Sequence, residues 1–137
     1  MFFKKIFYNN KSHIKDLIIL LKKSPNAVNF FRYFKNRNLQ IIKNHIVTLL
    51  LYIDNLPVGY GHIDLEKNIK WLGVMVADNF CGKGYGTKII NKLLTTVKGD
   101  IFLSVDKNNI SAYNLYAKIG FKIVEDRDLV YIMKLYV

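Results

Sequence analysis

Residues 71–94 read WLGVMVADNFCGKGYGTKIINKLL, and this pattern is the strongest indication of the fold. It begins with an apolar run of strand length and ends with an amphipathic run of helical period. Between them, at residues 81–86, three glycines alternate with larger residues. Glycine lets the backbone approach a ligand closely, and the start of a helix offers unpaired N–H groups and a positive dipole end. The stretch therefore predicts an anion-binding loop, most naturally for a phosphate or pyrophosphate.

Two common phosphate-binding motifs resemble this loop, and the sequence fits neither. A P-loop places Gly-Lys-Ser/Thr after its spacer residues, and Lys88 does not stand at that position. A dinucleotide fingerprint needs the spacing Gly-x-Gly-x-x-Gly and an acidic residue at the end of the next strand, a position that Asp106 could mimic. Here the spacing is Gly-x-Gly-x-Gly, and a long antiparallel meander precedes the loop, which a dinucleotide fold does not have.

The chain before the loop alternates apolar runs with turn signals. Residues 46–53, 58–65 and 69–77 read as three strands of an antiparallel meander. Nearer the N-terminus we expect a short strand over residues 2–8 and a helix capped by Ser12. After a break at residues 24–26, a second apolar helical stripe is expected from Ala27, Phe30, Phe31 and Phe34.

The chain after the loop returns to alternating elements. We expect the helix that follows the loop to reach about Val97, a buried strand over residues 101–105, and a helix from about Ser111 to Ile119 that Gly120 ends. A final hairpin is expected from residues 121–124 and 129–136. This order of elements indicates an α/β (α+β) domain with a mixed central sheet flanked by helices.

Length and composition agree with one globular domain over residues 1–137. Apolar residues make up 51% of the chain, yet no run approaches the ~20 apolar residues that span a bilayer, and we expect no signal peptide. One cysteine excludes an internal disulfide framework, so we expect a cytoplasmic protein. The net charge of +11 has two explanations, an anionic ligand or a bias toward Lys, Asn and Ile. Because the lysines are scattered, nucleic-acid binding is disfavoured.

A second segment narrows the interpretation. Residues 109–121, NISAYNLYAKIGF, fit the pattern Asn-x-x-Ala-x-x-Leu-Tyr-x-x-x-Gly-Phe. This pattern, following the glycine loop in this order and spacing, resembles the GNAT superfamily of acyl-CoA-dependent N-acyltransferases. The resemblance covers nearly the whole chain and is strongest over residues 70–121. It implies a single GNAT-like domain, with a mixed sheet of about six to seven strands and about four helices, that uses acetyl-CoA as co-substrate and no metal.

The resemblance also implies how the coenzyme is held. The backbone of residues 74–76 would pair with the pantetheine arm, the N–H groups of the loop would bind the pyrophosphate, and Asn109 would bond the arm or simply cap its helix. Tyr116 would protonate the departing thiolate, although a packed core tyrosine is the alternative. The expected coenzyme-binding residues are Val74, Met75, Val76, Cys81, Gly82, Lys83, Gly84, Tyr85, Gly86, Thr87, Asn109 and Tyr116.

Two positions depart from the family pattern. Cys81 stands where the motif has Gln or Arg, and Lys70 stands where some protein-acetylating members carry a glutamate base. Lysine is a poor base at neutral pH, so another group must take the amine proton. His62 and Asp64 share one face of a strand and are our catalytic candidates; the alternative is that both lie on a solvated face or edge. Asp78 is a weaker catalytic candidate, and the alternative is that it only shapes the turn.

The acceptor site is expected in residues 29–37, NFFRYFKNR. Aromatic and arginine side chains suit stacking against a ring and contact with phosphate, so Arg32, Tyr33 and His62 are the predicted substrate-binding residues. The alternative is that the phenylalanines are core and the basic residues merely exposed. The Phe-Arg-Tyr-Phe string is similar to that of GNAT members of surface-polysaccharide gene clusters. That similarity implies an amino sugar as acceptor, free or linked to a nucleotide.

Other functions stay open at this point. Within the enzyme class the rival acceptor is a protein N-terminus or lysine. The rival from another class is a coenzyme-binding or regulatory module without turnover, and nucleic-acid binding through the basic surface is a third. A homodimer is compatible with the sequence, and no membrane insertion is expected.

Overall fold

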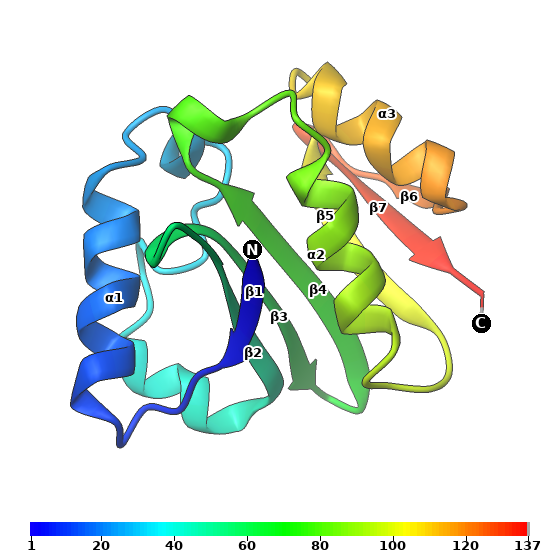
Figure 1. Ribbon diagram of the computed structural model, residues 1–137. Coiled ribbons are helices and arrows are strands. Elements are labelled where there is room, and N and C mark those ends of the chain that lie inside the picture. The colour runs from blue at the N-terminus through cyan, green and yellow to red at the C-terminus, as the bar shows by residue number, and fades with distance from the viewer. Residues whose placement is uncertain (137) are drawn as a thin grey trace.

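The computed structural model describes residues 1–136. Seven strands, three α-helices and three short 3₁₀ helices make up this part of the chain (Figure 1). In chain order they are β1 (Phe2–Lys5), α1 (Lys11–Lys22), η1 (Ala27–Asn29), η2 (Leu39–Asn44), β2 (His45–Ile53), β3 (Leu56–Glu66), β4 (Ile69–Val76), η3 (Asp78–Phe80), α2 (Tyr85–Leu94), β5 (Ile101–Asp106), α3 (Ile110–Ile119), β6 (Lys122–Asp126) and β7 (Val130–Leu135). None of the helices within residues 1–136 is long and apolar enough to cross a bilayer.

All seven strands form one mixed sheet in the order β1-β2-β3-β4-β5-β7-β6. Every neighbouring pair is antiparallel except β4 and β5, which are parallel. The predicted meander is confirmed, and its two turns have a local cause. Asp54 and Asn55 in the first turn, and Lys67 and Asn68 in the second, have positive φ, the backbone conformation that tight two-residue hairpins require.

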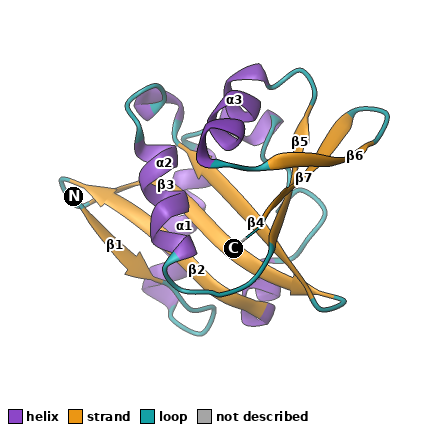
Figure 2. Cartoon of the chain, turned by 90° about the vertical axis from the view of Figure 1, so that its right-hand side faces the viewer, coloured by secondary structure: helices purple, strands orange, loops and turns teal. Residues whose placement is uncertain are grey.

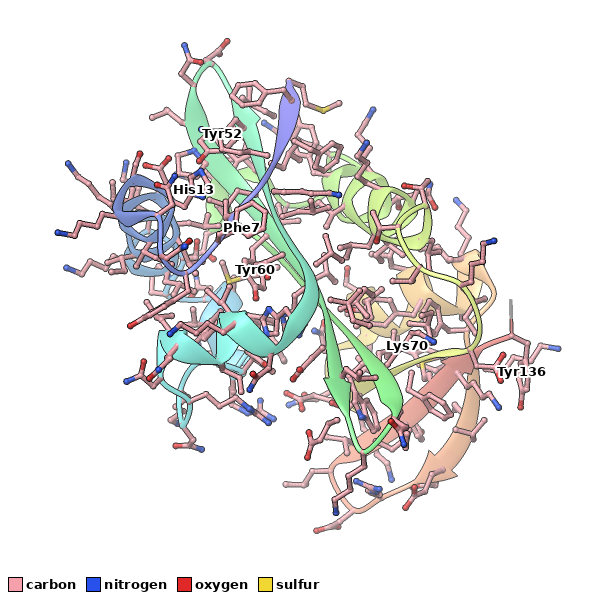
Figure 3. The ribbon with its side chains drawn as sticks, turned by 90° about the horizontal axis from the view of Figure 1, so that it is seen from below. Phe7, His13, Tyr52, Tyr60, Lys70 and Tyr136 are labelled. Carbon is pink, nitrogen blue, oxygen red and sulfur yellow. The ribbon has the colours of Figure 1, made fainter. Side chains whose placement is uncertain are left out.

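The two faces of the sheet carry separate hydrophobic cores because strand side chains alternate between them. On one face, α2 and α3 pack over a cluster that includes Leu49, Leu51 and Ile63. On the other face, α1 packs over a cluster that includes Leu50 and Tyr60. Figure 3 shows α1 and α2 on opposite sides of the sheet, and Figure 2 shows α3 beside the β6 and β7 strands.

Helix α2 approaches the sheet closely because β3 presents glycine to it. A Cβ built at Gly59 would lie 2.6 Å from Ile89, and one built at Gly61 would lie 2.5 Å from the same residue. No other residue would leave room for α2 at this distance. The close contact sets the position of the N-terminus of α2, where the glycine loop enters.

Several sequence-based boundaries were wrong by a few residues. The first strand covers only residues 2–5, and Asn10 rather than Ser12 caps α1, since its side chain accepts a hydrogen bond from the His13 N–H at 3.1 Å. Helix α2 stops at Leu94 rather than Val97, because the hydroxyls of the two threonines that follow bond carbonyls of the last turn. In the final hairpin the expected turn residues Glu125 and Asp126 belong to β6.

The expected helical stripe at residues 27–34 was also wrong. Only the short helix η1 forms there, and the chain then bends. Two contacts from distant residues account for this: the Asp78 carboxylate accepts hydrogen bonds from the N–H groups of Asn26 and Ala27, and the Phe31 ring packs 5.4 Å from that of Tyr60. Asp78 thus has the structural role of tying this loop to the end of β4.

Candidate active site

A gap between β4 and β5 creates the site. The two strands pair at one position, Trp71 opposite Phe102, and separate beyond it. The Ala77 N–H donates to the Val58 carbonyl at 2.8 Å, so its backbone faces β3. Since successive strand residues direct their backbone groups to opposite neighbours, those of Met75 also face β3, whereas those of Val74 and Val76 face the gap. Two of the three predicted backbone positions therefore lie open to a ligand.

One cleft of about 900 Å³ extends from this gap and joins both ends of the predicted site. The predicted residues that line it are Arg32, Tyr33, His62, Asp64, Val74, Met75, Val76, Cys81, Gly82, Gly84, Tyr85, Gly86, Thr87, Asn109 and Tyr116. Lys83 alone among the predicted residues does not line it; its Nζ lies 5.4 Å from the centroid of the Phe80 ring. Segments far apart in sequence thus form one site.

The glycine loop has the backbone of an anion cradle. Gly82 and Gly84 have φ of 76° and 83°, which L side chains rarely adopt. Gly84 is the N-cap of α2 and has no side chain to bond the first N–H groups, which leaves them for a ligand. Cys81 is largely exposed, and its thiol lies 3.5 Å from the Ala77 carbonyl. Burial of part of the side chain, together with the nearby Asp78 carboxylate, raises the pKa of the thiol. A neutral thiol therefore stands at the position where Gln or Arg was expected.

Helix α3 supplies two of the predicted polar groups. The Asn109 side chain accepts a hydrogen bond from the Ala112 N–H at 3.3 Å, so it caps α3 and also lines the cleft. The Tyr116 side chain is 8% exposed, and burial raises its pKa well above the ordinary value. Its ring packs edge-on against Phe121 at 6.0 Å. Its hydroxyl takes part in no side-chain hydrogen bond within residues 1–136, and because no buried polar atom there is left unpaired, the hydroxyl is open to the cleft. The arrangement presents a neutral phenol donor to the cleft.

His62 and Asp64 are buried rather than solvated, which excludes the alternative of a solvated face or edge. The His62 ring lies over Gly73, where a Cβ would come within 2.5 Å of it. Its Nδ1 is 2.7 Å from the Tyr60 hydroxyl, and burial lowers the pKa of His62 well below its usual value. Burial also raises the Tyr60 pKa, so the hydroxyl keeps its proton and donates it to Nδ1. The hydrogen-bond network thus assigns the His62 proton to Nε2.

Tyr33 connects Asp64 to a second histidine. The Tyr33 hydroxyl donates to Oδ2 of Asp64 at 2.7 Å, and His45 Nε2 lies 2.8 Å from the same hydroxyl. Nε2 therefore carries the His45 proton, and Nδ1 accepts from Thr48 at 2.8 Å. Burial lowers the His45 pKa to about 4, so the ring is neutral at neutral pH. The sequence did not point to His45, which becomes a candidate only because the β2–β3 register places it opposite Asp64.

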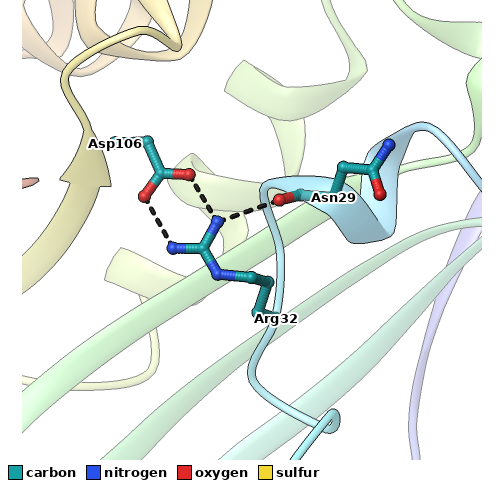
Figure 4. Close-up of polar contacts among 3 residues, drawn as sticks. All are labelled: Asn29, Arg32 and Asp106. Atoms are coloured by element: carbon teal, nitrogen blue, oxygen red, sulfur yellow. Dashed lines mark hydrogen bonds and ion pairs between the residues drawn. The ribbon is translucent and has the colours of Figure 1, made fainter. Parts of the chain in front are cut away.

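Arg32 makes a contact that the sequence did not predict. Its guanidinium forms two hydrogen bonds with Asp106, at 2.6 and 2.8 Å, and a third with the Asn29 carbonyl at 2.9 Å (Figure 4). Asp106 ends β5, so this ion pair links the η1 loop to the far side of the gap. Because this guanidinium already bonds Asp106 and Asn29, it is poorly placed to bind a substrate. Arg32 is predicted to have a structural role instead of the substrate-binding role that we expected. Arg37, also in this segment, lines the cleft instead.

Comparisons with known proteins agree with this geometry. The family described as acetyltransferase (GNAT) family matches residues 14–121. The uncharacterized N-acetyltransferase YobR of Bacillus subtilis is 29% identical over 111 residues, which cover 78% of this chain and 38% of that protein. The GNAT domain of S. lividans PAT has a TM-score of 0.82 at 10% identity, with 98% of this chain and 89% of that chain covered. The PaiA N-acetyltransferase of Thermoplasma acidophilum, in complex with coenzyme A, has a TM-score of 0.72 at 14% identity, with both chains fully covered (100%).

Replacing Gly84 with alanine is expected to weaken coenzyme A binding about tenfold. The substitution meets no neighbouring atom within 4 Å, but it strains a residue with φ of 83° and turns the loop N–H groups away from the anion. Gly99→Ala is the matched control, because Gly99 has φ of 88° and lies outside the cleft. Both variants should lose about 1 kcal/mol of unfolding free energy. Calorimetric titration with coenzyme A would contradict the assignment if the two variants bound it equally well.

Proposed function

The chain belongs to the acetyltransferase (GNAT) family, and on that basis we propose that it transfers an acetyl group from acetyl-CoA to a primary amine. The observation that carries the proposal is the single cleft, which joins the glycine loop, the unbonded Tyr116 hydroxyl and the Asp64 carboxylate. A donor site and an acceptor site that share one cleft permit direct transfer in a ternary complex. The match with this chain covers only 38% of YobR, so the proposal concerns this chain alone and not the activity of a longer protein.

The donor enters between β4 and β5. The free backbone groups of Val74 and Val76 bind the pantetheine arm as an added strand would, and the N–H groups of the loop bind the pyrophosphate. Tyr116 reaches the cleft from the α2 and α3 face of the sheet, whereas Asp64 and His62 lie on the α1 face with Tyr60. The thioester between them is therefore open to a proton donor on one side and to the amine on the other.

The chemical step moves one acetyl group and two protons. The amine nitrogen attacks the thioester carbonyl carbon, the new N–C bond forms, and the C–S bond breaks. The departing thiolate takes the Tyr116 proton, and the nitrogen releases its extra proton to Asp64. Water then returns a proton to Tyr116 and receives the one held by Asp64. A buried tyrosine whose pKa is raised stays neutral, as a donor must, until the thiolate forms.

Asp64 suits the acceptor proton better than His62 does. His62 carries its proton on Nε2 and receives another hydrogen bond at Nδ1, so no ring nitrogen is free to take a proton. Asp64 uses Oδ2 for Tyr33. Its Oδ1 takes part in no side-chain hydrogen bond within residues 1–136, and because no buried polar atom there is left unpaired, Oδ1 is open to the cleft. That oxygen can pair with the substrate ammonium. The ammonium loses one proton to water before the attack, and Oδ1 then takes the proton that the nitrogen releases once the N–C bond has formed. His62 becomes a hydrogen-bond donor to the acceptor or the acetyl oxygen.

The preferred acceptor is an amino sugar, free or linked to a nucleotide. Phe31 and Tyr33 stack with centroids 6.2 Å apart, and both line the cleft beside Asp64. An aromatic surface next to a carboxylate suits a sugar ring that bears an ammonium group. A protein N-terminus or lysine is the rival acceptor, and coenzyme binding without turnover is the rival function.

Incubation with acetyl-CoA and a panel of amines, read by mass spectrometry, separates these functions. We expect acetylated amino sugars and release of free coenzyme A. Acetylated peptides without acetylated sugars would show that the acceptor is a protein N-terminus or lysine and not an amino sugar. Coenzyme binding without any acetylated product would favour the rival function, a coenzyme-binding protein without turnover.

Replacing Tyr116 with phenylalanine is expected to lower kcat about 100-fold, because a general acid contributes roughly 10²–10⁴-fold. The ring and its packing remain, so the KM for acetyl-CoA should change less than about twofold. Tyr113→Phe is the control: Tyr113 lies on the same helix, packs at a tilt against Tyr131 with the ring centroids 5.7 Å apart, and does not line the cleft. The rates are measured by steady-state kinetics with the preferred acceptor. If both variants kept the wild-type rate, Tyr116 would not be the general acid.

Replacing Asp64 with asparagine is expected to lower kcat/KM for the amine about 100-fold at neutral pH, since Asn cannot take the proton. Asn retains a carbonyl oxygen for the Tyr33 hydrogen bond, so the fold should survive. Glu66→Gln is the control, because Glu66 also lines the cleft but is exposed. A larger loss for Glu66→Gln than for Asp64→Asn would assign the base to Glu66.

A further inference from the structure

Arg37 stands at the acceptor end of the cleft with most of its donors unused. Its guanidinium lies 4.3 Å from the centroid of the Tyr33 ring, and its Nη1 donates to the Tyr33 carbonyl at 3.0 Å. Arginine has five N–H donors, so the remaining ones face the cleft or the solvent. The ring and the carbonyl hold the guanidinium in place before any ligand arrives.

The charges around the cleft single out this arginine. Three arginines line it, and two are neutralised: Arg32 pairs with Asp106, and Arg127 pairs with Glu125 at 2.8 Å. Arg37 makes no ion pair with any carboxylate in the part of the chain that the structure describes. It is thus the cleft arginine that is available to an anionic ligand.

Tyr33 places this cation next to the proposed base. Its hydroxyl bonds the buried carboxylate of Asp64 at 2.7 Å, and its ring carries Arg37. A negative group and a positive group therefore stand about one tyrosine side chain apart on the same wall. A ligand that fills both positions needs an ammonium group and an anionic group separated by a similar span.

We propose that Arg37 forms a subsite for an oxyanion carried by the acceptor, so that the substrate is an amine bearing a phosphate or a carboxylate. The inference rests on the proposed function and narrows its substrate class. The planar guanidinium fork pairs with either oxyanion through two parallel hydrogen bonds, which lysine cannot reproduce. Pairing at Arg37 orients the acceptor with its amine at Asp64, facing the thioester.

Three matched amines test the subsite: glucosamine, glucosamine 1-phosphate and 2-amino-2-deoxyglucuronic acid, which keeps the sugar ring and carries a carboxylate. We expect wild-type kcat/KM to be at least tenfold higher for an anionic amine than for glucosamine. The phosphate and carboxylate arms identify which oxyanion the site takes. A wild-type enzyme with no preference for either anionic amine would overturn the proposal.

Arg37→Gln should remove that preference through KM, raising it at least tenfold for the anionic amine and less than twofold for glucosamine. Arg37→Lys should recover only part of it. Lys35→Gln is the control, because Lys35 is an exposed neighbour that does not line the cleft, and the loss of one surface charge is the same. Equal losses for Arg37→Gln and Lys35→Gln would reduce the effect to general electrostatics and overturn the subsite.

A binding measurement separates this proposal from the proposed function. Calorimetric titration of glucosamine 1-phosphate and 2-amino-2-deoxyglucuronic acid into the coenzyme A complex needs no turnover. Arg37-dependent binding without acetylation would uphold the subsite and overturn the transferase. Acetylation of amines with no dependence on Arg37 in either assay would do the reverse.

Discussion

The separation of β4 from β5 is the constraint on which the site depends. Each strand is fully paired on its outer side, β4 with β3 and β5 with β7, but the two pair with each other at one position. Buried backbone groups need hydrogen-bond partners, so the open edge at Val74 and Val76 favours a ligand that offers donors and acceptors in a line. The glycine loop continues from that edge, which puts the proposed pyrophosphate site at the end of the same groove.

The acceptor side depends on a second constraint, the burial of a carboxylate. Asp64 is 6% exposed, and a buried charge is tolerated only when it is paired or hydrogen-bonded. Tyr33 supplies that bond from a loop that has no regular structure of its own. Asp78 and the Arg32–Asp106 ion pair fasten this loop to the sheet at both sides of the gap. The residues that shape the proposed acceptor end therefore come from four separate segments.

Structural elements that form because of residues close together in the chain could be predicted from the sequence. The meander follows from alternating apolar runs and two hairpin turns, and the loop followed by α2 follows from the glycines at 82–86. The segment from residue 24 to residue 44 was not predictable, because its aromatic residues have a helical spacing that local rules take for a helix. Their packing partners, Tyr60 and His62, lie on β3, and only the folded sheet brings them within reach.

The family, the order of the strands in the meander, the proposed anion loop and the proposed role of Tyr116 could all be inferred from the sequence, because each depends on residues that are near neighbours in the chain. The tertiary structure alone decided which polar groups share the cleft. It engaged Arg32 with Asp106, joined His45 to Asp64 through Tyr33, and gave Arg37 no carboxylate partner among the residues that the structure describes. The physical reason is that ion pairs and buried hydrogen bonds form between side chains that the folding of the sheet brings together, and their partners are separated by tens of residues.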